Sequence, residues 1–145
     1  MAMDGLLALR ERLKSFAALN QFFTDHYGTV PKKHFIGYKR AANAAFLPAL
    51  CYVPVQGERK DNEKTELVSV IIQLTNKDES DDAFTGVLHI NQLAELVVND
   101  LTVNEVVGDF FVDGKIEVVN ALTESHPFYE IEIALTLKNV NAGPY

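Results

Sequence analysis

The sequence of 145 residues has no tryptophan, one cysteine and no apolar run long enough to span a bilayer. With one cysteine, the chain cannot form an internal disulfide or supply the several thiolates of a structural zinc cluster. Cys51 lies in the apolar run 50–53, and we predict a buried thiol that acts as a small hydrophobic side chain. Residues 1–9 have no basic start and no long apolar core, so we expect no signal peptide and a reducing cytoplasm.

The motifs that mark common enzymatic sites are also missing. The sequence has no Gly-x-x-x-x-Gly-Lys-Ser/Thr loop for phosphates, no Gly-x-Gly-x-x-Gly loop for dinucleotides and no Gly-x-Ser-x-Gly nucleophile elbow. Its four histidines lack the spacing that brings two imidazoles to zinc, and the acidic run 76–82 lacks the glycine and final glutamate of a calcium-binding loop. We therefore predict no enzyme activity, no catalytic residue, no metal site and no cofactor.

The charge balance disfavours nucleic-acid recognition. The chain has 13 basic and 20 acidic residues and a net charge of −7, whereas nucleic-acid binders concentrate Lys and Arg on one face. Residues 32–34 and 39–40 form a modest basic neighbourhood. We interpret it as a solvated loop or a protein contact, because an acidic chain repels DNA more readily than it binds it.

Two segments have the apolar spacing of amphipathic helices. Between residues 4 and 25, leucines and phenylalanines recur every three or four positions, with charged residues between them. Asp4 is a candidate N-cap for this helix, and Gly28 is expected to end it. A second helix is predicted for residues 88–101, where apolar residues line one side.

The last third of the chain has the clearest strand pattern. Residues 110–112 and 115–119 flank Asp113-Gly114, a dipeptide favoured in two-residue hairpin turns, so we predict a consecutive antiparallel meander over residues 110–138. In the final strand, apolar residues expected on the buried face alternate with polar ones, and these apolar residues are Ile131, Ile133, Leu135 and Leu137. Three glutamates of these strands could face one another; a solvated strand face is favoured over paired acid–base carboxylates for Glu117, Glu130 and Glu132.

Two earlier strands, over residues 46–53 and 67–74, enclose a charged segment, and a further short strand or extended arm is predicted over residues 34–40. Residues 56–66 are too polar for a core, and we predict a projecting charged hairpin loop. It serves either solubility or assembly, and the candidate assembly contacts are Glu58, Arg59, Lys60, Asp61, Glu63 and Lys64. The whole pattern predicts one α+β domain over residues 1–145, with a mainly antiparallel sheet, two packed helices, the order α-β-β-β-α-β-β and a loose tail at 139–145.

This layout resembles the tail terminator, or tail completion, proteins of long-tailed bacteriophages. The resemblance is carried by the leading helix, the Phe-Leu-Pro-Ala strand start at residues 46–49, the charged hairpin, the strand 65–75, the helix 88–101 and the closing antiparallel pair. It implies a structural subunit that forms a hexameric ring at the end of the tail tube, stops tube growth and joins the tail to the head connector. The implied partners are further copies of the chain, tail-tube proteins and head-connector proteins.

The same resemblance implies a location in the virion tail after assembly in the bacterial host cytoplasm. DNA would pass through the ring without specific binding, and no membrane would take part. Two other interpretations stay open. The chain could be a small cytoplasmic α/β ligand-binding or enzyme domain without a recognisable motif, or a regulatory or chaperone-like protein that binds a partner through its charged arm.

Overall fold

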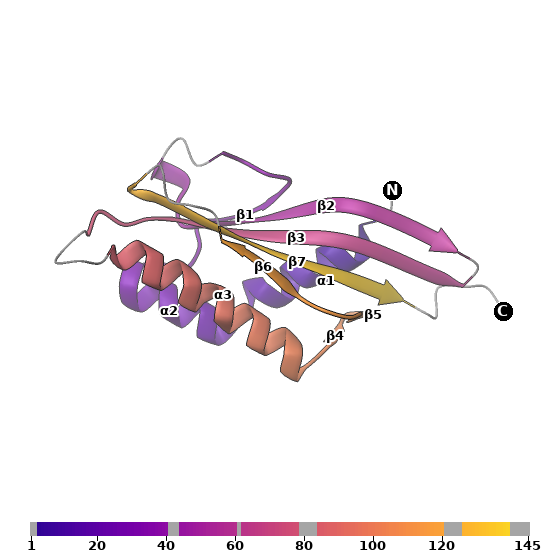
Figure 1. Cartoon of the computed structure of the whole chain (residues 1–145). Helices are drawn as coiled ribbons and strands as arrows, with labels where there is room; N and C mark the ends of the chain where they lie inside the picture. Colours follow the sequence, from indigo (N-terminus) through magenta and orange to yellow (C-terminus); the bar gives the residue numbers. More distant parts are fainter. Residues whose placement is uncertain (1–2, 41–43, 61, 79–83, 121–125, 140–145) are drawn as a thin grey trace.

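The computed structural model in Figure 1 describes residues 3–40, 44–60, 62–78, 84–120 and 126–139. Within these ranges the chain forms three α-helices, one short 3-10 helix and seven strands. The helices are α1 (Asp4–Lys14), α2 (Ala17–Tyr27) and α3 (Thr85–Val103), and the 3-10 helix is η1 (Ala44–Phe46). The strands are β1 (Lys33–Ile36), β2 (Ala49–Lys60), β3 (Glu63–Thr75), β4 (Val106–Val107), β5 (Phe110–Val112), β6 (Glu117–Asn120) and β7 (Phe128–Asn139).

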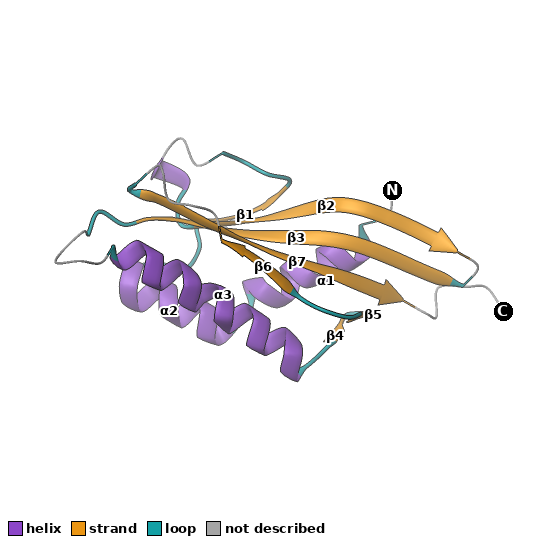
Figure 2. Ribbon diagram, in the orientation of Figure 1, coloured by secondary structure: helices purple, strands orange, loops and turns teal. Residues whose placement is uncertain are grey.

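All seven strands belong to one sheet in the order β1-β2-β3-β7-β5-β4, and β6 also pairs with β7. Every pairing is antiparallel except the parallel pair β1 and β2. The three helices lie on one side of this sheet, as Figure 2 shows. The α+β class with a mainly antiparallel sheet is therefore confirmed.

The core lies between the helices and the sheet. The alternation predicted for the last strand is confirmed, because Ile131, Ile133, Leu135 and Leu137 are all buried and their neighbours along β7 are only half-buried. Across the ladder the first three of them face Ile72, Val70 and Val68 of β3 in turn. One hydrophobic cluster joins these strands to apolar residues of all three helices. The apolar side chains that alternate along the strands and those that repeat along the helices therefore pack in one layer between the helices and the sheet.

The predicted first helix is wrong in length and in its cap. It is interrupted at Ser15, whose hydroxyl donates to the backbone oxygens of Glu11 and Arg12, and Phe16 has extended dihedral angles before α2 begins. Side-chain bonding to the preceding turn is a common cause of helix interruption. Asp4 is the first residue inside α1, where the N-cap is Met3, whereas Gly28 ends α2 in the left-handed region as predicted.

The predicted turn at Asp113-Gly114 is also wrong. Val112 pairs with Leu137, and further along the same edge of β7 Glu117 pairs with Ala134. The strands β5 and β6 therefore run in the same direction and do not pair with each other. Pairing both segments with the long strand β7 satisfies backbone groups that a separate hairpin would leave unpaired on that edge.

A two-residue hairpin turn does occur just before, at Gly108-Asp109. Val107 pairs with Phe110 there, and Gly108 has a φ of 60°, which glycine adopts without strain. The sequence analysis did not predict this turn, because it placed a hairpin turn only at Asp113-Gly114. The observed order has three helices and additional short strands, so the predicted two-helix order holds only in its coarse outline.

The predicted loop 56–66 is mostly strand. The strand β2 continues to Lys60 and β3 begins at Glu63, with the two paired along their whole length except for a register shift between Pro54 and Gln56. Alternate residues of a strand can all be polar where one face meets water, so charge alone did not exclude a strand. The predicted tail 139–145 begins one residue too early, because Asn139 is the last residue of β7; residues 140–145 lie outside the described ranges.

Candidate functional site

The side of the sheet away from the helices is only partly covered. Near the start of β2, Gln73 donates its side-chain amide to the backbone oxygen of Lys39 at 2.7 Å, and Tyr38 donates its hydroxyl to Glu130 at 3.0 Å. Burial and this bond to a carboxylate raise the pKa of Tyr38 to about 12. The remaining, uncovered part is called here the open face, and its central residues are Val53, Val55, Leu67, Ser69, Ile71, Glu117, Val119, Glu132, Ala134 and Thr136.

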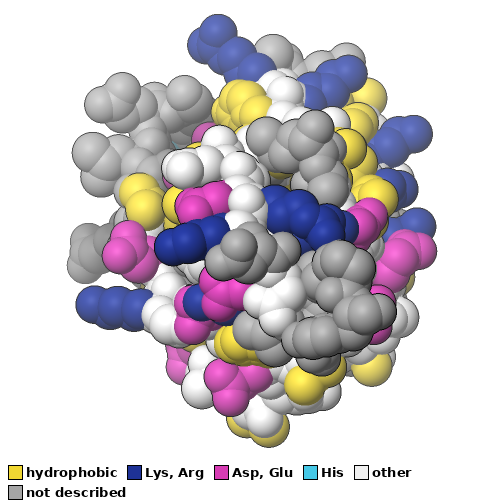
Figure 3. All heavy atoms as spheres, turned by 90° about the vertical axis from the view of Figure 1, so that its right-hand side faces the viewer, with side chains coloured by type: hydrophobic (Ala, Val, Ile, Leu, Met, Phe, Trp, Pro, Cys, Tyr) yellow, Lys and Arg dark blue, Asp and Glu magenta, His cyan; other side chains and the backbone are white. Residues whose placement is uncertain are grey.

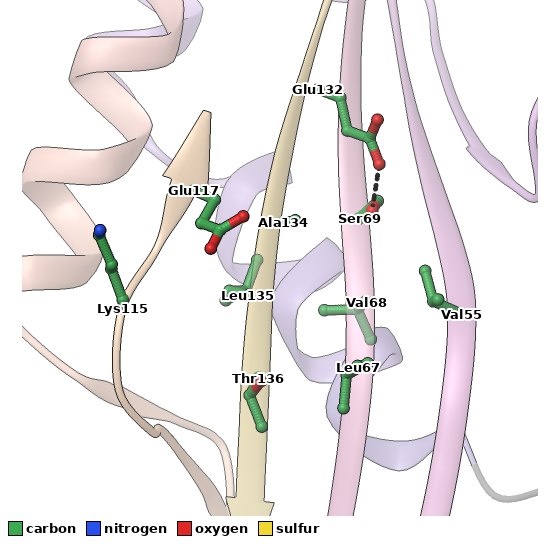
Figure 4. A pocket seen from close by; sticks show the side chains of 10 residues that line it. All are labelled: Val55, Leu67, Val68, Ser69, Lys115, Glu117, Glu132, Ala134, Leu135 and Thr136. Atoms are coloured by element: carbon green, nitrogen blue, oxygen red, sulfur yellow. Dashed lines mark hydrogen bonds between the residues drawn. The ribbon is translucent and has the colours of Figure 1, made fainter. Parts of the chain in front are cut away.

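A groove of about 310 Å³ lies in the open face. Its apolar floor includes Val55 and Leu67, which are 57% and 37% exposed. Its polar groups come from β3, β6, β7 and Lys115 just before β6, and Figure 4 shows the Glu132 side chain turned toward Ser69, with Glu117 on the other side of Ala134. The groove therefore has an apolar base, and its sides carry two carboxylates and one lysine.

Glu132 is held in place by the sheet itself. The hydroxyl of Ser69, a residue that is only 2% exposed, donates to a Glu132 carboxylate oxygen at 2.6 Å. A short bond to a carboxylate is among the stronger hydrogen bonds in proteins and fixes the direction of that side chain. Neither Glu132 nor Glu117 forms an ion pair within the described part of the chain.

The sheet brings the three predicted strand glutamates to one side. Glu117 and Glu132 share the groove. Glu130 lies beside residues 37–40, where it accepts hydrogen bonds from the Tyr38 hydroxyl and the Gln73 side-chain amide. Their common face followed from the alternation. The alternation did not predict that Glu130 has different surroundings from Glu117 and Glu132, because that depends on where residues 37–40 cross the sheet.

The hairpin of β2 and β3 brings the predicted assembly contacts to one end of the sheet. Glu58, Arg59 and Lys60 are exposed on β2, and Asp61 lies outside the described residues. Figure 3, which looks onto this end of the molecule, shows basic and acidic side chains interspersed over it. This end can therefore meet a partner surface of either sign.

The β3 half of the hairpin is already engaged within the molecule. Lys64 forms an ion pair with Asp4 at 3.2 Å, and Glu63 forms one with Lys138 at 3.5 Å. The predicted contacts thus divide into exposed residues on β2 and residues on β3 that tie the hairpin to the rest of the fold. The exposed residues of the hairpin are therefore those of its β2 half.

The outer edge of β2 is also open along most of its length. Its pairing with β1 ends at Tyr52, so from Val53 to Lys60 the strand has no neighbour on that side among the described residues. Pro54, the register shift that follows it and the charged residues beyond are features that discourage indiscriminate strand pairing. Selective contact through side chains is therefore favoured over simple extension of the sheet.

Sequence reasoning missed the role of Glu66. Its carboxylate, 5% exposed, accepts hydrogen bonds from the backbone N–H groups of Gly5 at 2.9 Å and Leu6 at 3.1 Å. It satisfies free N–H groups at the start of α1 and places negative charge at the positive end of the helix dipole. Glu66 is two residues before Val68 and four before Val70 on β3. This two-residue spacing would have predicted that Glu66 lies on the buried face with them.

A half-buried histidine lies on β1. His34 is hydrogen-bonded through Nδ1 to the hydroxyl of the fully buried Tyr52 at 2.8 Å. Burial lowers the pKa of His34 to about 4, and the nearby cations of Lys14 and Arg10 add to the effect. Cys51 is buried as predicted, and burial raises the pKa of its thiol.

Two histidines that are far apart in the sequence meet between α2 and α3. The ring centroids of His26 and His89 lie 4.4 Å apart. His89 Nδ1 forms a 2.8 Å hydrogen bond with the Tyr27 hydroxyl. Burial lowers the pKa of His89, and His26 lowers it further. Within the described part of the chain, no three His, Cys, Asp or Glu side chains converge as a metal site requires.

No helix in the described ranges has the length and apolar character needed to cross a bilayer. No protein-family model and no curated protein matches this chain.

Proposed function

We propose that this chain is a non-enzymatic structural subunit of a bacteriophage or prophage tail. In this role, copies of the chain form a hexameric ring at the end of the tail tube, stop tube growth and join the tail to the head connector. The observation that carries the proposal is the hairpin of β2 and β3, which presents exposed charged residues at one end of the sheet while internal ion pairs hold its other strand.

A closed ring needs two different surfaces on each subunit, because the contact is head-to-tail. The hairpin end and the open face would serve as such a pair: one presents exposed charged residues, and the other contains a groove with an apolar base. They lie on the same sheet, so a rigid framework sets the angle between them. A fixed angle is what allows repeated copies to close.

The mechanism is steric and electrostatic. A ring seated on the tube end covers the surface to which another tube ring would add, and its other side remains available to the head connector. The net charge of −7 suits a channel for DNA, because an acidic wall does not trap phosphates by counterion release.

The proposal is tested by the molar mass from light scattering over a concentration series, with negative-stain images and a tail-tube growth assay. A ring with a central hole that halts tube growth is expected. The matched variants are Glu58→Lys/Arg59→Glu/Lys60→Glu at the hairpin and Lys32→Glu at an exposed position before β1, which changes net charge equally. Substitutions are preferable to a deletion of 58–64, which would remove paired strand residues and the Lys64–Asp4 ion pair.

The hairpin variant is expected to lose assembly while the Lys32→Glu control retains it. Both should keep the wild-type thermal unfolding midpoint, because the substituted side chains are exposed. A wild-type chain that stays monomeric and leaves tube growth unchanged would overturn the proposed function.

A further inference from the structure

The two arginines of α1 differ in how far the fold satisfies them. Arg12 donates to the Asp100 carboxylate at 3.0 Å and to the backbone oxygens of Val106 and Asp100 at 2.8 and 2.9 Å. Arg10 is half-buried, and among the residues that the structure describes its buried Nε has no hydrogen-bond partner and its guanidinium forms no ion pair. A buried donor without a partner is costly, and it often marks a place where an ion or a water molecule binds.

Arg10 belongs to a group of basic side chains between α1 and β1. Lys14 is one turn further along the same side of α1, because residues four positions apart are neighbours on a helix. Besides burial, the charges of Lys14 and Arg10 lower the pKa of His34, so both cations lie near this ring. Burial raises the pKa of Tyr52, and the charge of Arg10 opposes that rise. Because His34 and Tyr52 are bonded to each other, these effects place the Arg10 and Lys14 side chains at the same edge of the sheet.

A neighbouring carboxylate, that of Glu11, offsets this positive charge only in part. The Glu11 side chain is 68% exposed, and its carboxylate lies 3.7 Å from Lys14 Nζ. An exposed pair at this distance is weak and leaves the Arg10 guanidinium without a counterion. Arg10 and Lys14 together therefore outweigh Glu11.

His34 can add an uncharged donor to these two cations. Its Nδ1 is 2.8 Å from the hydroxyl of the fully buried Tyr52. When that hydroxyl donates to Nδ1, the proton of the neutral ring is on Nε2 and can be donated to a further acceptor. A guanidinium, an ammonium group and an imidazole N–H together match the oxygens of phosphate, sulfate or a carboxylate.

We propose that Arg10, Lys14 and His34 form a binding site for an oxyanion, which is either a small ion such as phosphate or a carboxylate of a second copy of the chain. Arg10 makes the main contact through the paired N–H groups of its guanidinium, Lys14 adds charge, and His34 donates from Nε2. The bound oxyanion compensates the guanidinium that the fold leaves without a counterion. The site lies on the helix side of the sheet beside β1, away from the open face and the hairpin end, so it does not rest on the proposed function.

The first test is a titration with sodium sulfate at constant ionic strength, followed by the backbone amide signals in NMR spectra. Saturable shifts that cluster in α1 and β1 are expected. Arg10→Gln should weaken binding at least about 10-fold, because it removes a charged hydrogen-bonding partner. Lys14→Gln, at an exposed position, should weaken it about 3-fold. The control Lys77→Gln removes one positive charge at another exposed position and should bind like the wild type.

Circular dichroism and thermal unfolding check that each variant folds, and Lys14→Gln keeps the test valid if Arg10→Gln does not. The absence of saturable shifts in the wild type would overturn the site. Sulfate that binds Arg10→Gln or Lys14→Gln as tightly as it binds Lys77→Gln would overturn it too.

The pKa of His34 gives a second readout, which an effect on folding alone would not change. An anion next to the ring stabilises the imidazolium, so saturating sulfate should raise the pKa of His34 by about 0.5 or more. The imidazole signals of NMR spectra recorded over a pH series measure it, and His34→Gln assigns the signal. The pKa of His89, which lies between α2 and α3, should stay unchanged. Sulfate binding without a change at His34 would place the ion elsewhere and overturn the site.

Analytical ultracentrifugation at low salt identifies the source of the oxyanion. If the wild type self-associates, and both sulfate and Arg10→Gln reduce its mass, the site binds a carboxylate of a second copy. If the wild type and Arg10→Gln have the same mass while sulfate binds only the wild type tightly, the site binds a small ion. A self-association that neither sulfate nor Arg10→Gln reduces would overturn the second-copy assignment.

Discussion

The two faces of the sheet are built from alternate residues of the same strands, yet they have different chemistry. On the helix side, Ile133 of β7 and Val70 of β3 are fully buried. On the open face, the adjacent positions Glu132 and Ser69 are joined by a hydrogen bond beside a groove. One strand can thus supply stability with one set of side chains and a contact surface with the other.

The difference also determines how each face should respond to substitution. Each large apolar side chain buried under the helices contributes roughly 1.5–3 kcal/mol through burial. Exposed side chains of the open face, such as Leu67 and Glu117, remain in contact with water, where substitutions usually change stability little. Stability experiments therefore distinguish the faces, and assembly experiments are needed to detect what the open face does.

The largest contrast is expected from Ile133→Asp. The new carboxylate would be buried without a partner under the helices, so we expect a loss of about 4 kcal/mol in the free energy of unfolding, measured with urea. The matched control is Thr136→Asp, on the same strand but on the open face, with an expected change below about 1 kcal/mol. Equal effects at the two positions would contradict the assignment of the faces.

A second test concerns a close approach of α3 to the helix side of the sheet. A Cβ atom on Gly86 of α3 would lie 2.3 Å from the ring of Tyr129, which is itself buried. Gly86→Ala should therefore destabilise the protein by about 1–3 kcal/mol, even though alanine is the better helix former by about 1 kcal/mol. Thermal unfolding measures the change, and Gln92→Ala at an exposed position of α3 is the control. Stabilisation by Gly86→Ala would show that the helix can move away.

Glu66 is an exception to the apolar character of the helix side of the sheet, because it is a buried carboxylate there. Glu66→Gln removes the negative charge from the start of α1 and should lower the free energy of unfolding by about 1–2 kcal/mol. Glu58→Gln, in the exposed part of the same hairpin, should have an effect near zero. If urea unfolding gave the same value for both variants, the carboxylate of Glu66 would not stabilise the helix through its charge.

The smallest expected effect is the pH dependence that His34 causes. Its pKa is about 4 in the fold against about 6.5 in an unfolded chain, so the unfolded state binds more protons between these values. Its contribution to stability is therefore constant above pH 6.5 and is lost as the pH falls toward 4. Because the ring is partly exposed, we expect a loss of about 1 kcal/mol by pH 5. Urea unfolding at pH 7.5 and 5.0 should show a smaller loss in His34→Gln, and an identical loss would rule out this histidine as the cause.

The features that sequence reasoning predicted correctly depend on local patterns. The alternation in β7, the left-handed helix end at Gly28 and the burial of Cys51 each follow from a few neighbouring residues. The interruption at Ser15 was missed because the apolar repeat continues through it without glycine or proline. Its cause, the bonding of the serine hydroxyl to the previous turn, competes with helix only weakly.

The features that were missed depend on residues far apart in the sequence. Asp113-Gly114 has the composition of a hairpin turn, but pairing of the flanking segments with β7 decides the outcome. The acidic groove exists because the register places Glu117 opposite Ala134 and next to Glu132. The alternation placed both glutamates on one face, but only the register makes them neighbours.

The capping of α1 by Glu66 has a consequence for the order of events during protein synthesis. An isolated helix of 11 residues is marginal in water, and the group that caps this one is about sixty positions further along the chain. While the ribosome is still making β2, residues 4–14 have neither their cap nor a sheet to pack against. Their apolar side chains are then exposed to water. Residues 4–14 are thus translated before the strand that caps them but reach their native state after it.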